Sequence, residues 1–156
     1  MSSEARNDRQ AGQGPIAAPP PELIDRLGYL FKHAQLRLSE LTAAALEPYG
    51  VNGRELAVLL VLAGCEPASQ QQAAMRLGVD RTTMVALLDA LEDKGLVVRH
   101  PHAQDRRKNV VELTAVGRDT LERATEAGED AERRFLAPLS ETAAQQLKDA
   151  LRALIV

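Results

Sequence analysis

Residues 69–99, SQQQAAMRLGVDRTTMVALLDALEDKGLVVR, contain the start and stop signals of two consecutive helices. Ser69, with a Gln three residues later, forms a capping box that opens the first helix, and Gly78 ends it. Asp80 caps a longer helix, which closes at Lys94 and the glycine that follows. A short helix, a turn that contains Gly and a longer helix predict a helix-turn-helix.

A short hairpin follows this motif. Residues 96–99 and 110–113 are rich in Val and Leu and predict two strands. The loop between them, residues 100–109, is polar and contains clustered charges. Two strands joined by a basic loop directly after a helix-turn-helix indicate a wing.

Two further helices are predicted on the N-terminal side. Apolar residues recur at intervals of three and four, which predicts an amphipathic helix from the proline run at residues 19–21 to about Leu46. The Pro-Tyr-Gly at residues 48–50 breaks it. Asn52, with a Glu three residues later, opens a second helix over residues 53–63. This helix is apolar nearly all round, so we expect it to be buried on several sides.

Two more helices follow the wing. Thr114 caps one that runs to about Phe135, and Ser140 opens the last. The predicted fold is therefore mainly α, an α+β winged helix with six helices and a two-stranded β-wing. The first and last helices carry apolar stripes too long for one small domain to cover, which predicts a helical dimerisation region.

The chain is predicted to have four parts. Residues 1–21 are rich in Ser, Gln, Gly and Pro, and we expect a disordered or loosely held arm. An arm that covers a partner subunit is the alternative. Residues 22–48 are the first dimerisation helix, residues 49–114 the winged helix-turn-helix lobe, and residues 115–156 the C-terminal dimerisation helices.

The charge distribution is uneven. The formal net charge is −3, yet four basic residues oppose one acidic residue between Val98 and Val110, which gives that segment a net charge of +3. A local basic spot on an acidic body suits a small DNA-binding surface. Cys65 is the one cysteine, so an intramolecular disulfide is excluded. With neither a signal-peptide pattern nor an apolar stretch long enough for a bilayer, we expect a cytoplasmic location.

Three motifs stand in a fixed order between residues 77 and 117. They are a Glu-Asp-Lys-Gly-Leu helix exit, an Asp-x-Arg in the wing and a Leu-Thr-x-x-Gly opening of the next helix. Together with the flanking helix pairs, this order resembles the MarR family of transcriptional regulators. The resemblance implies a homodimer that binds a near-palindromic operator in duplex DNA, and a repressor that a small phenolic or lipophilic effector releases.

Six polar residues at the starts of two helices are the predicted DNA contacts of the helix-turn-helix: Arg81, Thr82 and Thr83 on the second helix, and Ser69, Gln70 and Gln71 on the first. The second helix would enter the major groove, where its N-terminal residues reach base edges. Its threonines also suit an ordinary first turn. The first helix crosses the DNA backbone in this motif, so its residues would donate to phosphates, with simple helix capping as the alternative.

Five charged residues complete the predicted DNA site: Arg99, Asp105, Arg106, Arg107 and Lys108. In the family that the chain resembles, the carboxylate of the Asp-x-Arg pairs with the arginine, which enters the minor groove. By position these residues are Asp105 and Arg107. Arginine suits a narrow A·T minor groove because the negative potential is enhanced there. The other three bases would contact phosphates, and a solvated charge run is the alternative.

An effector site is predicted on the first helix. Tyr29 and His33 are four residues apart and therefore share a face, where they could line a pocket for a carboxylate or a phenol. A packed tyrosine beside a satisfied or exposed histidine is the alternative. Cys65 follows an apolar helix, and we expect a small buried hydrophobe rather than a redox sensor.

The sequence contains no enzyme signature. It has no Gly-rich phosphate loop, no Gly-x-Ser-x-Gly and no His-Glu-x-x-His, and its three histidines have no zinc-ligand spacing. We therefore expect no catalytic residues, no cofactor and no metal. The alternative function is a dimeric small-molecule-binding or protein-interaction module that has lost specific DNA binding.

Overall fold

The computed structural model describes residues 19–64, 68–101 and 109–155. The chain divides into two compact units, residues 1–34 and residues 35–156. Nearly all of the predicted N-terminal arm lies outside the described residues.

The first unit contains a helix break that the sequence pattern did not predict. The four-residue helix α1 (Pro21–Ile24) ends at Asp25, and α2 (Leu27–Leu46) begins two residues later and continues into the second unit. The Arg26 N–H donates to the Leu23 carbonyl, three residues back, at 3.1 Å, so the chain tightens into a turn here. The single helix expected in this region is therefore two, and the described residues form seven α-helices rather than six.

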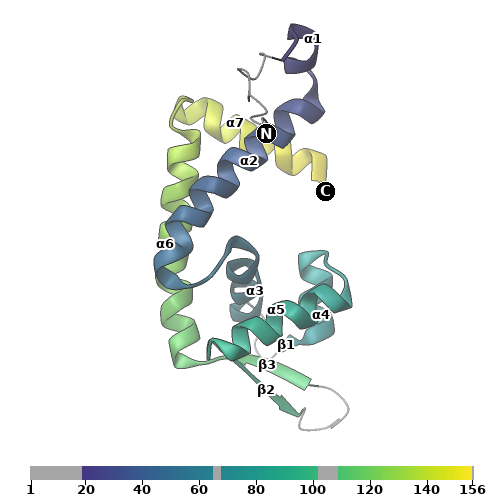
Figure 1. Ribbon diagram of the computed structural model, residues 1–156, viewed down its shortest axis with the longest axis vertical. Coiled ribbons are helices and arrows are strands. Elements are labelled where there is room, and N and C mark those ends of the chain that lie inside the picture. Colours follow the sequence, from purple (N-terminus) through teal and green to yellow (C-terminus); the bar gives the residue numbers. More distant parts are fainter. Residues whose placement is uncertain (1–18, 65–67, 102–108, 156) are drawn as a thin grey trace, which may run out of the picture. The chain divides into compact units, whose positions relative to one another are not determined.

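The helix-turn-helix prediction is confirmed in the second unit. After α2, the 3-10 helix η1 (Glu47–Tyr49) leads into α3 (Gly53–Ala63), and α4 (Gln70–Leu77) and α5 (Arg81–Asp93) follow. Figure 1 shows α4 and α5 lying side by side. The turn between them contains Gly78, whose φ of +64° is the left-handed conformation that glycine adopts without a steric penalty.

Local capping explains where these helices begin. The Asn52 side chain accepts a hydrogen bond from the N–H of Glu55 at 3.0 Å, and the Ser69 hydroxyl accepts one from the N–H of Gln72 at 3.2 Å. In both cases the third helical residue also accepts a hydrogen bond from the cap backbone, which completes the capping box.

The wing is part of a three-stranded sheet. Strands β2 (Val97–Pro101) and β3 (Asn109–Leu113) form the predicted antiparallel hairpin. A third strand, β1 (Ala68–Ser69), was not predicted, and its two residues pair with Val111 and Val110 of β3. The order is β1-β3-β2, so β2 is an edge strand.

The hydrophobic core of the second unit is aliphatic. Its largest fully buried side chains come from α2, α3, α5 and β3: Leu46, Val58, Leu59, Leu62, Met84, Leu88, Leu91 and Val111. Helix α3 contacts α4, α5, α6 and β3, as its nearly uniform apolar sequence predicts. This packing fixes one face of α5 against the core and leaves the opposite face exposed.

Two helices complete the second unit. Helix α6 (Ala115–Leu136) is capped by Thr114, and α7 (Glu141–Ile155) by Ser140, whose hydroxyl accepts the N–H of Ala143 at 3.2 Å. No residue of α7 is buried, and three of its large apolar side chains are exposed: Leu147, Leu154 and Ile155. None of the described helices combines the length and the hydropathy that crossing a membrane requires.

Candidate nucleic-acid interface

Helix α5 presents one stripe of side chains to solvent. Its buried residues, Met84, Leu88 and Leu91, follow the spacing of one helix face. The exposed residues on the other side are spaced by four, three and four along the helix: Thr82, Ala86, Asp89 and Asp93. The stripe is therefore neutral in the first half of the helix and acidic in the second.

The three predicted base-contacting residues at the start of α5 do not behave alike. Arg81 and Thr82 are exposed. The Thr83 hydroxyl instead donates to a carboxylate oxygen of Asp80 at 2.6 Å, and the Thr83 N–H donates to the other oxygen at 2.9 Å. These bonds hold the pKa of Asp80 below its usual value, because they favour the ionised carboxylate. Arg81 and Thr82 are thus the residues of this turn that face outward.

The start of α4 combines capping with a polar exposed surface. The Ser69 hydroxyl accepts the helix N–H described above, so the capping alternative is what the structure shows for this residue. A serine hydroxyl that accepts still has a proton to donate. Gln71 is exposed and Gln70 is half-buried, so Gln71 is the more accessible of the two for a phosphate contact.

The charged loop of the wing is outside the part of the chain that the structure describes. Asp105, Arg106, Arg107 and Lys108 lie outside the described residues, as do Cys65 and His102. The described part of the hairpin ends at the paired residues Pro101 and Asn109, between which the loop departs and returns.

Arg99 lies against α5. Its guanidinium forms ion pairs with Asp89 at 2.6 Å and with Glu92 at 2.7 Å, and its backbone N–H donates to Glu92 at 3.3 Å. The side chain is 19% exposed. The sequence predicted a phosphate contact here, whereas the structure brings Arg99 to two carboxylates. The sequence analysis predicted neither partner. Asp89 and Glu92 are three residues apart on the helix that precedes the strand of Arg99, and this spacing could have indicated an ion pair.

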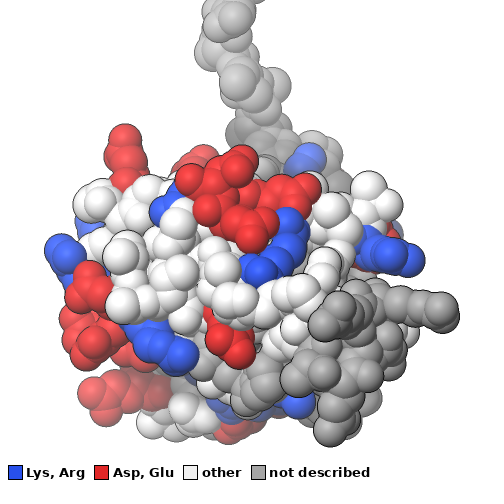
Figure 2. All heavy atoms as spheres, turned by 90° about the horizontal axis from the view of Figure 1, so that it is seen from below, with Lys and Arg blue, Asp and Glu red and all other residues white. Residues whose placement is uncertain are grey.

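The described part of this lobe is not basic. Between Ser69 and Thr114 the described residues carry four bases and five acids: Arg76, Arg81, Lys94 and Arg99 against Asp80, Asp89, Glu92, Asp93 and Glu112. Figure 2 shows acidic and basic side chains interspersed over the described atoms at this end of the molecule. The further bases that the sequence contains between Ser69 and Thr114 are Arg106, Arg107 and Lys108 of the wing loop.

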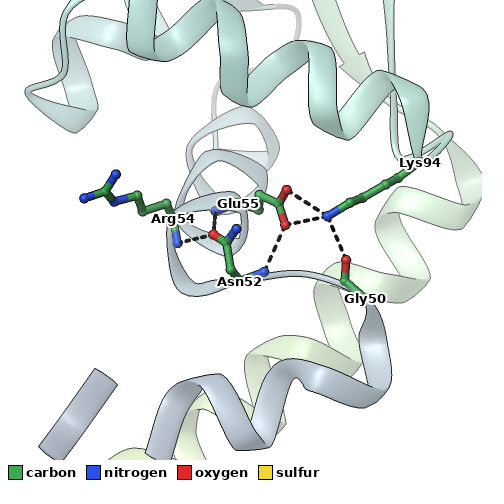
Figure 3. A network of polar contacts seen from close by, with 5 residues as sticks. All are labelled: Gly50, Asn52, Arg54, Glu55 and Lys94. Carbon is green, nitrogen blue, oxygen red and sulfur yellow. Dashed lines mark hydrogen bonds and ion pairs between the residues drawn. The ribbon is translucent and has the colours of Figure 1, made fainter. Parts of the chain in front are cut away.

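The C-terminal end of α5 is tied to α3 through a network that the sequence did not predict (Figure 3). The ammonium of Lys94 lies 2.8 Å from both carboxylate oxygens of Glu55 and donates to the Gly50 carbonyl at 2.8 Å. The Glu55 carboxylate also accepts the Asn52 N–H at 2.9 Å. Glu55 is the buried charged residue of the described chain, so one carboxylate serves both the α3 cap and the α5 end.

The two predicted effector residues are adjacent, as their spacing requires. The rings of Tyr29 and His33 have centroids 4.1 Å apart and are tilted by 39°. Tyr29 is half-buried and His33 is exposed. Among the described residues, no group of three or more His, Cys, Asp or Glu is placed to hold a metal ion.

Known proteins resemble this chain in sequence and in fold. A model of the MarR family matches residues 49–108. A Thauera aromatica protein described as "Putative transcriptional regulatory protein for hcr operon" is 32% identical over 120 residues, which are 76% of this chain and 72% of that protein.

Two solved structures extend the similarity. The transcriptional repressor CouR, bound to a 23-mer DNA duplex, has a TM-score of 0.84 and 34% identity, covering 90% of this chain and 100% of that one. CouR from Rhodococcus jostii RHA1, bound to p-coumaroyl-CoA, has a TM-score of 0.73 and 29% identity, covering 85% and 93%.

Proposed function

The chain belongs to the MarR family of transcriptional regulators, and on that premise we propose that it is a repressor that binds a near-palindromic operator as a homodimer and leaves it when a small molecule binds. One observation carries the proposal. Helix α5 is held to the core by one face and exposes Arg81 and Thr82 at its N-terminus, directly beside a wing.

Each element has a role on duplex DNA. Helix α5 enters the major groove, where an arginine such as Arg81 can make a bidentate contact to guanine and a threonine such as Thr82 can contact a base or a thymine methyl. Helix α4 crosses the backbone, where Ser69 and Gln71 donate to phosphates. Arg107, paired with Asp105, enters the minor groove, and the neighbouring bases contact phosphates.

Dimerisation follows from the exposed apolar residues. Leu27 and Leu30 on α2 are 71% and 48% exposed, and Leu154 and Ile155 on α7 are 73% and 82% exposed. Large exposed apolar side chains of this kind mark an interaction surface, and a dimer is typical of the family. Two copies related by a two-fold axis would read two half-sites, which is why the operator should be near-palindromic.

The test of DNA recognition is fluorescence anisotropy with the duplex upstream of the protein's own gene, a scrambled duplex and a salt series. We expect tight, steeply salt-dependent binding that prefers the native duplex. Arg107→Ala should lower the affinity about tenfold or more and reduce the salt slope by about one. Arg133→Ala on α6 makes the same change at a 67% exposed site away from this interface and should bind like the wild type.

Two results would overturn this proposal. Equal binding by Arg107→Ala and Arg133→Ala would remove Arg107 from the DNA site. Equal and weak binding of the wild type to both duplexes, and to sites selected from the whole genome, would favour the module that has lost specific DNA binding. The described lobe's excess of acids is the observation that keeps this second function in view.

The effector we propose is an aromatic acid or its coenzyme A thioester. The adjacent rings of Tyr29 and His33, and the similarity to a regulator solved with p-coumaroyl-CoA, support it. Adding p-coumaroyl-CoA to the protein–DNA complex should weaken binding by about 5- to 150-fold, the usual range of such coupling. Tyr29→Ala should reduce that effect, whereas Lys32→Ala on the same helix should not. Coenzyme A alone is the ligand control, and release by coenzyme A alone or no release at all would contradict the assignment.

A further inference from the structure

The acidic half of α5 poses a problem for the proposed DNA contact, on which this inference rests. Asp89 and Asp93 lie on the exposed stripe of the helix, and Glu92 is half-exposed beside them. Duplex DNA carries one negative charge per roughly 1.7 Å of its axis, so carboxylates on a groove-facing helix oppose binding. A cation that neutralises them locally would remove part of this repulsion.

Arg99 is placed to do this. One terminal nitrogen of its guanidinium lies 2.7 Å from Glu92, and the other lies 2.6 Å from Asp89 and donates to the Val85 carbonyl at 3.5 Å. Its Nε is buried and has no hydrogen-bond partner among the described residues, so water does not reach this donor. The guanidinium is thus occupied by α5.

Arg99 also connects two parts of the DNA-binding lobe. It stands in the edge strand β2, opposite Val111 of β3, while its three side-chain partners among the described residues are all on α5. The Arg99 N–H donates to Glu92 as well, so both the backbone and the side chain of this residue hold the strand to the helix. The base of the wing and the recognition helix therefore share one ionic clamp.

We infer that Arg99 is a positioning residue for DNA binding: it neutralises Asp89 and Glu92 and sets the wing against α5, and it makes no phosphate contact. Only arginine suits this role, because its planar fork presents separate nitrogens to two carboxylates, whereas lysine presents a single point charge. Lysine would serve equally well as a simple phosphate contact.

The test measures operator affinity and salt slope for three changes: Arg99→Lys, Arg99→Met, and Asp89→Asn with Glu92→Gln. We expect Arg99→Lys to bind about tenfold more weakly than the wild type, and Arg99→Met to bind more weakly still with an unchanged salt slope. Arg133→Lys on α6 is the matched control for the exchange and should have no effect. Thermal unfolding of each variant checks that it is folded at the temperature of the assay.

The second part of the test is the variant that neutralises both acids, Asp89→Asn with Glu92→Gln. In the wild-type background it should change the affinity by less than about threefold, because Arg99 already neutralises these acids. In the Arg99→Met background it should restore most of the lost binding. This non-additivity identifies an interaction between the residues. If Arg99→Met fails to fold, the inference is still tested by the affinity of Arg99→Lys and by the paired neutralisation in the wild-type background.

Failure of the inference and failure of the proposed function give different results. A wild type that binds selectively while Arg99→Lys binds equally well, or a Met variant whose salt slope falls by about one, would make Arg99 a phosphate contact and overturn the inference alone. The inference would also be overturned if neutralising Asp89 and Glu92 raised the affinity equally in the wild-type and Arg99→Met backgrounds. A wild type that prefers no duplex would overturn both.

Discussion

Replacing Gly117 with alanine is expected to lower the free energy of unfolding by about 3 kcal/mol, because the new methyl group would collide with backbone that has no room to move. An ideal Cβ at this position lies 1.9 Å from the Leu96 carbonyl oxygen and 2.9 Å from its carbon. These are backbone atoms, so rotating a side chain cannot relieve the overlap.

The surrounding hydrogen bonds hold this carbonyl in place. The Thr114 N–H donates to the Leu96 oxygen at 3.1 Å, and the Thr114 hydroxyl donates to the Gly95 carbonyl at 2.7 Å while accepting the Gly117 N–H at 2.9 Å. The start of α6 is thereby fastened to the segment between α5 and β2. Alanine at Gly117 must break part of this junction or tilt α6 away from the wing.

Urea denaturation at a fixed protein concentration measures the effect, and the melting temperature should fall by about 10 °C for a loss of this size. Gly128→Ala is the matched control on the same helix, since its Cβ would meet only a Leu56 methyl at 3.5 Å. Because alanine is more favourable than glycine inside a helix, the free energy of unfolding of this variant should be unchanged or higher by up to about 1 kcal/mol. Equal stability of both alanine variants would show that the close approach at Gly117 is not maintained in solution.

This junction illustrates what the sequence could predict. The Leu-Thr-x-x-Gly pattern was useful as a family motif, and capping by Thr114 followed from local chemistry. The same holds for the capping boxes of Asn52 and Ser69, because the cap and its partner are three residues apart. The need for Gly117 was not visible, since it depends on Leu96, a residue 21 positions away that folding brings beneath the helix.

Features that depend on distant partners were missed elsewhere as well. Strand β1 has only two residues and no alternating pattern, and it exists because β3 is there to pair with it. The break at Asp25 is a small departure from an otherwise regular apolar period.

The candidate site follows the same rule. The sequence predicted the start of α5 from its cap, and Arg81 and Thr82 are exposed there. A positive charge on a strand, however, does not reveal what it is paired with. Arg99 looked like a phosphate contact because it falls in a segment of net charge +3, from Val98 to Val110. Its actual partners, Asp89 and Glu92, are on the preceding helix.

The ion pair between Lys94 and Glu55 leads to the second large effect. Lys94→Met is expected to lower the free energy of unfolding by about 2 kcal/mol, because it leaves a buried carboxylate without its counter-charge. The Glu55 side chain is 5% exposed, so water cannot replace the lost ammonium. We set the loss below that of a fully buried pair because Lys94 is 39% exposed and the Asn52 N–H still bonds to the carboxylate.

Lys148 and Glu132 provide a matched control between α6 and α7. Lys148 is 40% exposed, like Lys94, but its carboxylate partner is 45% exposed rather than 5%. Lys148→Met should therefore cost less than about 1 kcal/mol, the usual contribution of a surface pair. The two lysines are similarly exposed, so the comparison varies the burial of the acid together with the hydrogen bond that Lys94 donates to the Gly50 carbonyl.

A double-mutant cycle separates the charge effect from the loss of the lysine stem. Glu55→Gln retains an oxygen that accepts the Asn52 N–H but removes the negative charge, so Lys94→Met should cost much less in that background. Urea denaturation of the two single variants and the double variant gives the coupling energy. Equal costs of Lys94→Met in both backgrounds would mean that Lys94 acts through its stem or through its hydrogen bond to the Gly50 carbonyl, and not through the carboxylate. In that case the burial of Glu55 would have to be stabilised by its helix cap alone.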